Sequence, residues 1–132
     1  MPPDTTAALR QAAAGLTYQS ETDAPWEVVS WPDATGAPTA EGVLRVGKHR
    51  KTAKVEEQGL EDFFAPLVRD EEWYGPEEKA VSAKYRDLLE TVRRLLTAPK
   101  VFRVGSRKAA VYVLGEAPEG GWGGLKTTAV ET

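Results

Sequence analysis

Acidic side chains are the most numerous groups that could do chemistry in this chain of 132 residues, which has 20 Asp and Glu residues, one histidine and no cysteine. The lack of cysteine excludes disulfides, thiol catalysis and metal sites built from cysteine. A single histidine, His49, cannot form a two-histidine metal site within one chain. It stands in the basic run GKHRK, which favours a solvated turn over a catalytic role.

An aromatic pair inside an acidic frame is the first distinctive feature. The stretch DEEWYGPEE, residues 70 to 78, surrounds Trp73 and Tyr74 with carboxylates. A buried aromatic anchor with a polar rim is typical of protein interfaces. The same residues could instead serve the following helix, with Trp73 packing as a hydrophobic staple and the acids favouring the helix dipole. Both interpretations stay open from composition alone.

A second acidic stretch, SETDAPWE, spans residues 20 to 27. Composition favours a solvated turn for Glu21 and Asp23. A small hydrolase that uses a carboxylate pair such as Asp23 and Glu27 is the least favoured interpretation, because the sequence offers neither a nucleophile nor a second set of ligands. No arrangement of residues elsewhere supports an enzyme, and no cofactor motif is present.

The C-terminal end LKTTAVET, residues 125 to 132, is unusual because a β-prone run continues almost to the terminal carboxylate. Either the last strand simply ends there or the terminus itself has a function.

Two further stretches favour structural explanations. The run KHRKTAK, residues 48 to 54, could contact phosphates, but it lacks interleaved aromatics and favours a solvated loop. The run GGWGG, residues 120 to 124, lacks the spacing of a dinucleotide or phosphate loop and favours a flexible hairpin loop. The net charge of -3 argues against a broad surface that binds nucleic acid directly. No apolar stretch approaches the ~18 residues of a spanning helix, so we expect a soluble, cytoplasmic protein without membrane contact.

The first half of the chain predicts a helix, a strand and a shorter helix that would position these groups. A helix is expected over residues 4 to 16, capped by Asp4 or Thr5, with Gly15 in a left-handed conformation at its end. A polar loop then leads to a strand over residues 26 to 31. Residues 43 to 55 are expected to form one strand and a basic turn, and LEDFFAPLV, residues 60 to 68, a short helix bent near Pro66.

The second half contains the most regular patterns. Apolar residues at three- and four-residue spacing predict a long helix that begins at Pro76 and ends before Pro99. Alternating patterns then predict three strands: KVFRVG, AAVYVLGEA and GGLKTTAVET. The turn SRK is short enough to join the first two as a hairpin. The sequence therefore predicts one α+β domain, residues 1 to 132, with helices packed on a sheet.

Four stretches, taken in order, resemble the nuclease A inhibitor family: AAAGLTYQSETDAPWEV, LEDFFAPL, EWYGPEEKAVSAKYRDLLE and VYVLGEAPEGGWGGLKTTAVET. The resemblance covers nearly the whole chain and includes the final VET. It implies a three-layer α-β-α sandwich resembling the pathogenesis-related-1-like fold. It also implies inhibition of a sugar-nonspecific, magnesium-dependent DNA and RNA nuclease of the ββα-metal class.

The resemblance further implies which residues contact the nuclease. Glu21 corresponds to the loop glutamate of the family, and Thr132 to the terminal residue that bridges to the catalytic magnesium ion of the nuclease. Asp23 and Glu131, beside these two positions, and the aromatic pair at residues 73 and 74 are further expected contacts. We expect a one-to-one complex and a monomer when the protein is free. The alternative is a non-inhibitory binding module of the same fold with another protein partner.

Overall fold

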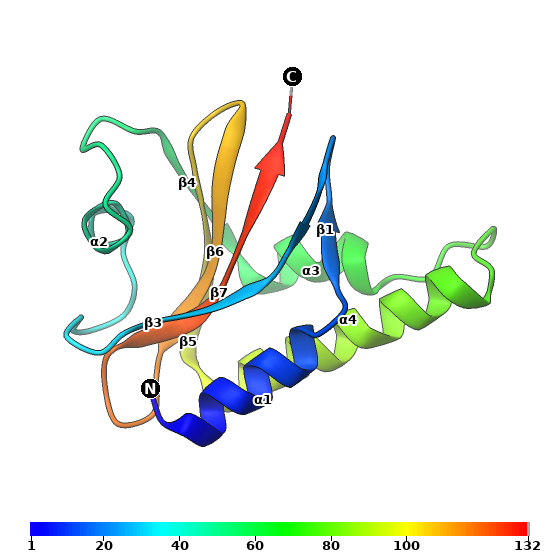
Figure 1. Ribbon diagram of the computed structural model, residues 1–132, viewed down its shortest axis with the longest axis horizontal. Helices are drawn as coiled ribbons and strands as arrows, with labels where there is room; N and C mark the ends of the chain where they lie inside the picture. Colours follow the sequence, from blue (N-terminus) through cyan, green and yellow to red (C-terminus); the bar gives the residue numbers. More distant parts are fainter. Residues whose placement is uncertain (132) are drawn as a thin grey trace.

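A five-stranded antiparallel sheet runs through the centre of the computed structural model, which describes residues 1–131 (Figure 1). Its strands, in spatial order, are β3 (Glu27–Trp31), β7 (Trp122–Val130), β6 (Lys108–Glu116), β5 (Thr97–Val104) and β4 (Val55–Gly59). The α+β class and the three C-terminal strands predicted from alternation are confirmed. The last strand, β7, lies between β3 and β6, so its main chain is paired on both sides.

Residues 17–25, expected as a polar loop, form a small two-stranded hairpin instead. Its strands are β1 (Thr17–Gln19) and β2 (Asp23–Pro25). The Thr127 hydroxyl of β7 donates to the carbonyl oxygens of Ala24 and Pro25, at 3.4 and 2.9 Å. The prediction was wrong because these short strands are supported by a distant part of the chain rather than by their own composition.

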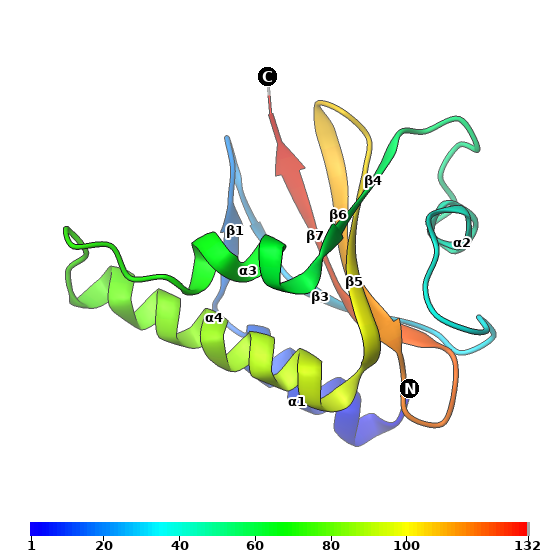
Figure 2. The same cartoon turned by 180° about the vertical axis from the view of Figure 1, so that it is seen from behind.

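Three helices cover one face of the sheet: α1 (Pro3–Ala13), α3 (Leu60–Val68) and α4 (Pro76–Leu95) (Figures 1 and 2). The stripe predicted on α4 is buried at Tyr85, Leu88, Leu89 and Val92. Beneath the β1–β2 hairpin, the Trp26 indole donates to the Tyr85 hydroxyl at 3.1 Å, and this hydroxyl donates to the Thr17 carbonyl at 2.8 Å. These bonds connect the hairpin to the long helix.

The fourth helix, α2 (Ala40–Val46), lies on the opposite face of the sheet (Figure 1). A strand was expected in this region, and that prediction was wrong. The Thr39 side chain accepts a hydrogen bond from the Gly42 amide at 3.1 Å and caps the helix. Gly42 sits against the indole of Trp122, where a Cβ atom would overlap the ring. The helix is therefore fixed by packing on β7, which the local pattern could not reveal.

Element ends differ from the sequence predictions at several points. Helix α1 begins after Pro2 without a side-chain cap, so neither expected cap residue serves as one. Gly15 has the expected left-handed φ of 79°, two residues after the helix ends at Ala13. Pro99 lies inside β5, at an irregularity between Thr97 and Lys100, rather than directly after α4. The predicted helix α3 is confirmed, with Pro66 inside it.

Within residues 1–131, no helix is both long and apolar enough to cross a lipid bilayer.

Candidate functional site

The tip of the β1–β2 hairpin is hydrogen-bonded to the end of the last strand. The Glu21 amide donates to the Val130 carbonyl at 3.1 Å, and the Val130 amide donates to the Ser20 hydroxyl oxygen at 2.9 Å. The Ser20 hydroxyl also donates to the Thr22 carbonyl at 3.0 Å, which closes the turn. The structure thus brings the first expected contact residue, Glu21, to the point at which β7 ends.

Glu131 continues the path of β7 and is held at two atoms. Its amide donates to the Arg107 carbonyl in the β5–β6 turn at 2.7 Å. Its carboxylate lies 2.9 Å from Nη2 of Arg103, a half-buried residue of β5. Thr132, the expected metal-bridging residue, lies outside the described residues.

Asp23 and Glu27 are exposed and belong to strands of different sheets, β2 and β3. In the register of the strands, Asp23 faces Gln19 and Glu27 faces Lys126. Among residues 1–131, no group of three His, Asp or Glu side chains could hold a metal ion. The structure thus places Asp23 in the hairpin that carries Glu21, with Glu27 on the neighbouring sheet.

Trp73 and Tyr74 project from the loop between α3 and α4. The Trp73 side chain is 75% exposed, so it does not act as a buried staple for the helix. Its ring meets that of Tyr74 edge to face, with centroids 4.6 Å apart. The start of α4 is instead stabilised by Glu78, whose carboxylate accepts from the Gly75 amide at 3.0 Å. Trp73 is therefore a large apolar side chain available for contact with another molecule.

The acids around this aromatic pair fall into two groups. Glu71 pairs with Arg69 at 2.8 Å, and Asp70 lies 3.7 Å from Arg86. Among the ion pairs formed within residues 1–131, none involves Glu72 or Glu77. The loop consequently keeps an acidic character around its exposed tryptophan.

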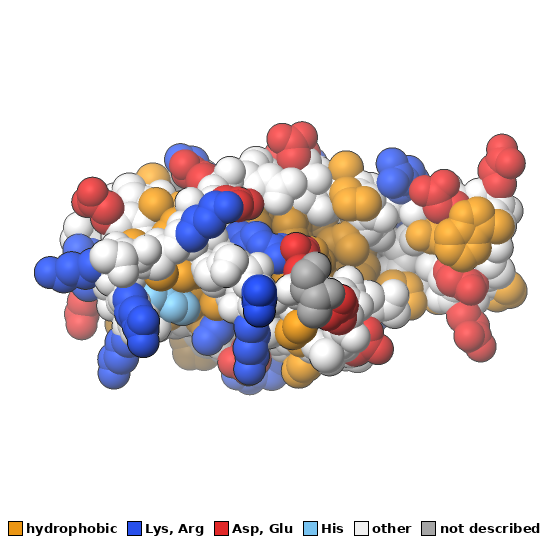
Figure 3. Space-filling model, turned by 90° about the horizontal axis from the view of Figure 1, so that it is seen from above, with side chains coloured by type: hydrophobic (Ala, Val, Ile, Leu, Met, Phe, Trp, Pro, Cys, Tyr) orange, Lys and Arg blue, Asp and Glu red, His pale blue; other side chains and the backbone are white. Residues whose placement is uncertain are grey.

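A groove lies between this loop and the hairpin. It is lined by residues of β1, α3, α4 and the loop, including Leu16, Gln19, Leu67, Trp73, Val81 and Tyr85. Figure 3 shows the molecule from the edge at which β7 ends. Hydrophobic side chains lie between the centre of this view and its right-hand end, where acidic side chains gather. The hairpin tip, the end of β7 and the aromatic loop therefore share one side of the protein.

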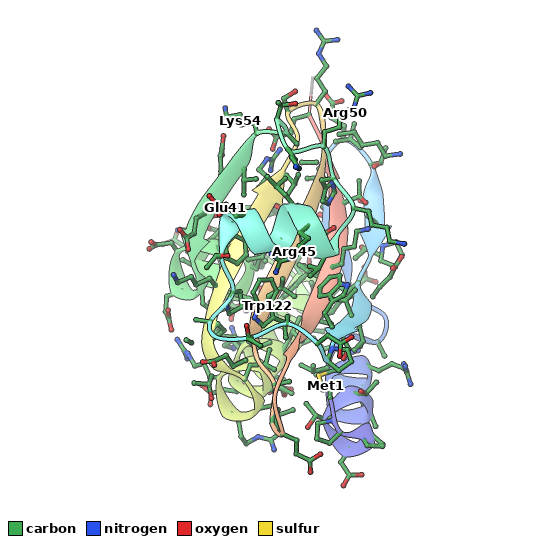
Figure 4. All side chains as sticks on the ribbon, turned by 90° about the vertical axis from the view of Figure 1, so that its left-hand side faces the viewer. Met1, Glu41, Arg45, Arg50, Lys54 and Trp122 are labelled. Carbon is green, nitrogen blue, oxygen red and sulfur yellow. The ribbon has the colours of Figure 1, made fainter. Side chains whose placement is uncertain are left out.

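Basic residues gather at the opposite end, around the loop that follows α2. Arg45 and Arg50 are seen on the α2 side in Figure 4. The Gly105 amide donates to the Lys54 carbonyl at 2.9 Å, which brings this loop beside the β5–β6 turn. The charges are thus distributed unevenly: in Figure 3 acidic side chains predominate at the right-hand end and basic ones are more numerous toward the other end, although the net charge is small.

His49, expected in a solvated turn, is half-buried and contacts the sheet. Its Nε2 lies 2.7 Å from the hydroxyl of the buried Tyr112. Burial, followed by the positive charge of Lys126, lowers the pKa of His49. This residue therefore fixes the basic loop on the sheet, and the expectation of a solvated side chain was wrong.

Ser20 and Arg103 are site residues that the sequence interpretation missed. Ser20 bonds to a residue 110 positions away, so no local pattern could reveal its role. Arg103 did leave a signal. In KVFRV, alternation places it on the same sheet face as the buried Val101, where a charged side chain needs a partner.

Comparison with known proteins agrees with the resemblance noted in the sequence. A family model described as nuclease A inhibitor-like protein matches residues 3–132. No curated protein matches the chain. The matched region includes the hairpin tip, the aromatic loop and the end of β7.

Proposed function

This chain belongs to the nuclease A inhibitor-like protein family, and from that membership we propose that it inhibits a sugar-nonspecific, magnesium-dependent nuclease of the ββα-metal class. The protein would bind the nuclease as a one-to-one complex and block access of DNA and RNA to the active site. No catalytic step by the inhibitor is required. It would act as a single domain and a monomer when free, and protect the cytoplasm of a cell that exports the nuclease.

The observation that carries the proposal is the pair of hydrogen bonds between the hairpin tip and Val130. They place Glu21 beside the strand end that leads to Thr132. Glu21 and Val130, which are more than a hundred residues apart in the sequence, thus belong to one tip. A tip held in this way loses less conformational freedom on binding than a flexible tail would.

The chemistry of the tip suits a magnesium centre. Mg²⁺ prefers oxygen ligands and keeps open or water-filled positions that a nuclease offers to phosphate oxygens. The terminal carboxylate and hydroxyl of Thr132 would supply such oxygens and bridge to the metal. Glu21 would add a second anionic group within a cleft that is basic because it holds nucleic acid.

The remaining expected contacts extend the interface along the same side of the protein. Asp23 and Glu131 flank the tip, while Trp73 and Tyr74 lie across the groove from β1 of the same hairpin. Glu72 and Glu77, which form no ion pair within residues 1–131, would speed association with a basic cleft through electrostatic steering. The helices on both faces of the sheet favour the three-layer, pathogenesis-related-1-like arrangement expected for the family.

Titration into a ββα-metal nuclease that digests plasmid DNA in magnesium buffer tests this function. We expect cleavage to stop at one equivalent of protein. Deletion of Thr132, or addition of two residues after it, should weaken inhibition strongly, because either change moves the terminal carboxylate. Glu21→Gln should weaken inhibition while leaving the hydrogen bond of the Glu21 amide in place.

Glu27→Gln is the matched control, since it removes one exposed carboxylate from β3 and should leave inhibition unchanged. Circular dichroism would verify that each variant is folded. Inhibition that survives both loss of Thr132 and replacement of Glu21 would refute the metal-bridging tip. No inhibition by the unaltered protein, combined with stable association, would instead support the non-inhibitory binding module.

A further inference from the structure

An arginine of β5 lies beneath the projecting tip and contacts its last described residue. Arg103 Nη2 is 2.9 Å from Oε1 of Glu131. This nitrogen is buried, and the geometry of the contact gives it no aligned hydrogen bond within residues 1–131. Among residues 1–131, the Glu131 carboxylate is the one acidic group within ion-pair distance of this guanidinium.

Two neighbouring strands flank the Arg103 side of this ion pair. Arg103 lies between Glu56 of β4 and Val111 of β6 in the sheet register. Both Arg103 and Glu131 influence Tyr18 of the hairpin: burial raises the pKa of the Tyr18 hydroxyl most, Arg103 lowers it, and Glu131 raises it. The charges of the pair thus act on a residue of the hairpin that carries Glu21.

Glu131 is restrained at its backbone, while its side chain is largely exposed. Its amide is fixed on one side by the Arg107 carbonyl. The preceding residue, Val130, is fixed on the other side by Ser20 and Glu21. The side-chain contact with Arg103 adds a third restraint, on the sheet face opposite α2, and acts on the residue directly before Thr132.

We infer that Arg103 is a positioning residue for the end of β7: its guanidinium attracts the Glu131 carboxylate and so restrains the last residue that the structure describes. The role of this restraint in inhibition rests on the proposed function. The restraint itself does not, and it can be measured without a nuclease.

Release of Thr132 by carboxypeptidase provides that measurement. Arg103→Met keeps the unbranched stem and the sequence of the chain end but removes the charge. We expect release of Thr132 to become about two- to fivefold faster, the factor that corresponds to the usual strength of a partly exposed ion pair. Arg107→Met is the matched control. It removes the charge of a nearby arginine but keeps the backbone carbonyl through which Arg107 binds the Glu131 amide.

Arg103→Lys provides a second variant that retains the positive charge, and it should restore much of the slow release. Folding of all variants would be compared by urea unfolding. Equal release rates for the unaltered protein, Arg103→Met and Arg107→Met would overturn the inference, as would faster release that is equally large in the Arg107 control.

The inhibition assay then tests the consequence for function. Arg103→Met should raise the inhibition constant by a similar factor, mainly through faster dissociation, and should have no further effect once Thr132 is deleted. An effect of equal size in the truncated protein would show that Arg103 acts by another route and would overturn the inference. Failure of the unaltered protein to inhibit would reject the proposed function, while the carboxypeptidase rates would still decide the restraint.

Discussion

Replacement of Ser20 by alanine directly tests the connection between the hairpin and the end of β7. The Ser20 oxygen accepts from the Val130 amide at 2.9 Å and donates to the Thr22 carbonyl at 3.0 Å. Thr22 is exposed, so water can replace the second bond. The first bond is partly buried, and its loss should cost about 1 kcal/mol, within the usual net range for a protein hydrogen bond.

That free energy predicts the size of the functional effect. If the bond holds Glu21 and the chain end in the geometry that binds the nuclease, its loss should raise the inhibition constant about fivefold at 25 °C. The backbone bond from Glu21 to Val130 remains in the variant, so inhibition should weaken rather than disappear. Amide exchange at Val130 should become faster by a comparable factor.

Ser106→Ala is the matched control, because this serine lies exposed in the neighbouring β5–β6 turn. Inhibition of the nuclease and hydrogen exchange at Val130 would be measured for both variants. The reasoning is refuted if the two variants have the same rate of amide exchange at Val130 and the same inhibition constant. Faster exchange with unchanged inhibition would retain the connection but separate it from binding.

Three further predictions test other parts of the molecule. Trp73→Ala should change the free energy of unfolding by less than about 0.5 kcal/mol, because the side chain is 75% exposed. If Trp73 is an interface anchor, the same change should weaken inhibition about tenfold or more. Inhibition equal to that of the unaltered protein would argue against the contact. Burial and the charge of Lys126 lower the pKa of His49 from 6.5. The unfolded chain therefore binds the proton more readily than the folded protein, and stability should fall as the pH drops below about 6.5. Between about pH 7.5 and about pH 5.5, the urea midpoint of His49→Gln should fall less than that of the unaltered protein. Gly124→Ala should reduce stability by about 3 kcal/mol in urea unfolding, since the new Cβ would overlap the Val113 carbonyl; near-normal stability would show that the sheet can yield there.

Several elements could be predicted because their information is local. The spacing of Tyr85, Leu88 and Val92 predicts a helix with one apolar face, and these residues are buried in α4. Proline has no amide proton, and the first amides of a helix have no partner within the helix, so Pro76 marks the beginning of α4. The three C-terminal strands follow in the same way from alternation, and their antiparallel pairing is confirmed.

Other elements could not be predicted because distant residues decide them. Residues 43–46 have a composition compatible with a strand, but the Thr39 cap and the packing of Gly42 on Trp122 favour a helix over residues 40–46. The β1–β2 hairpin depends on bonds from Thr127, more than a hundred residues later. His49 looked solvated in its basic run, yet it contacts Tyr112 on the sheet.

For the candidate site, too, some features could be predicted from local sequence and others depend on distant residues. The sequence by itself determined which oxygen-bearing and aromatic residues were present, and its resemblance to a family singled out Glu21 and the C-terminus. Only the tertiary structure decided that the hairpin tip and the end of β7 meet, and that Arg103 lies beneath them. The reason is physical: periodicity reports which face of an element is buried, whereas these contacts depend on the register between strands, which is set by the packing of the whole sheet.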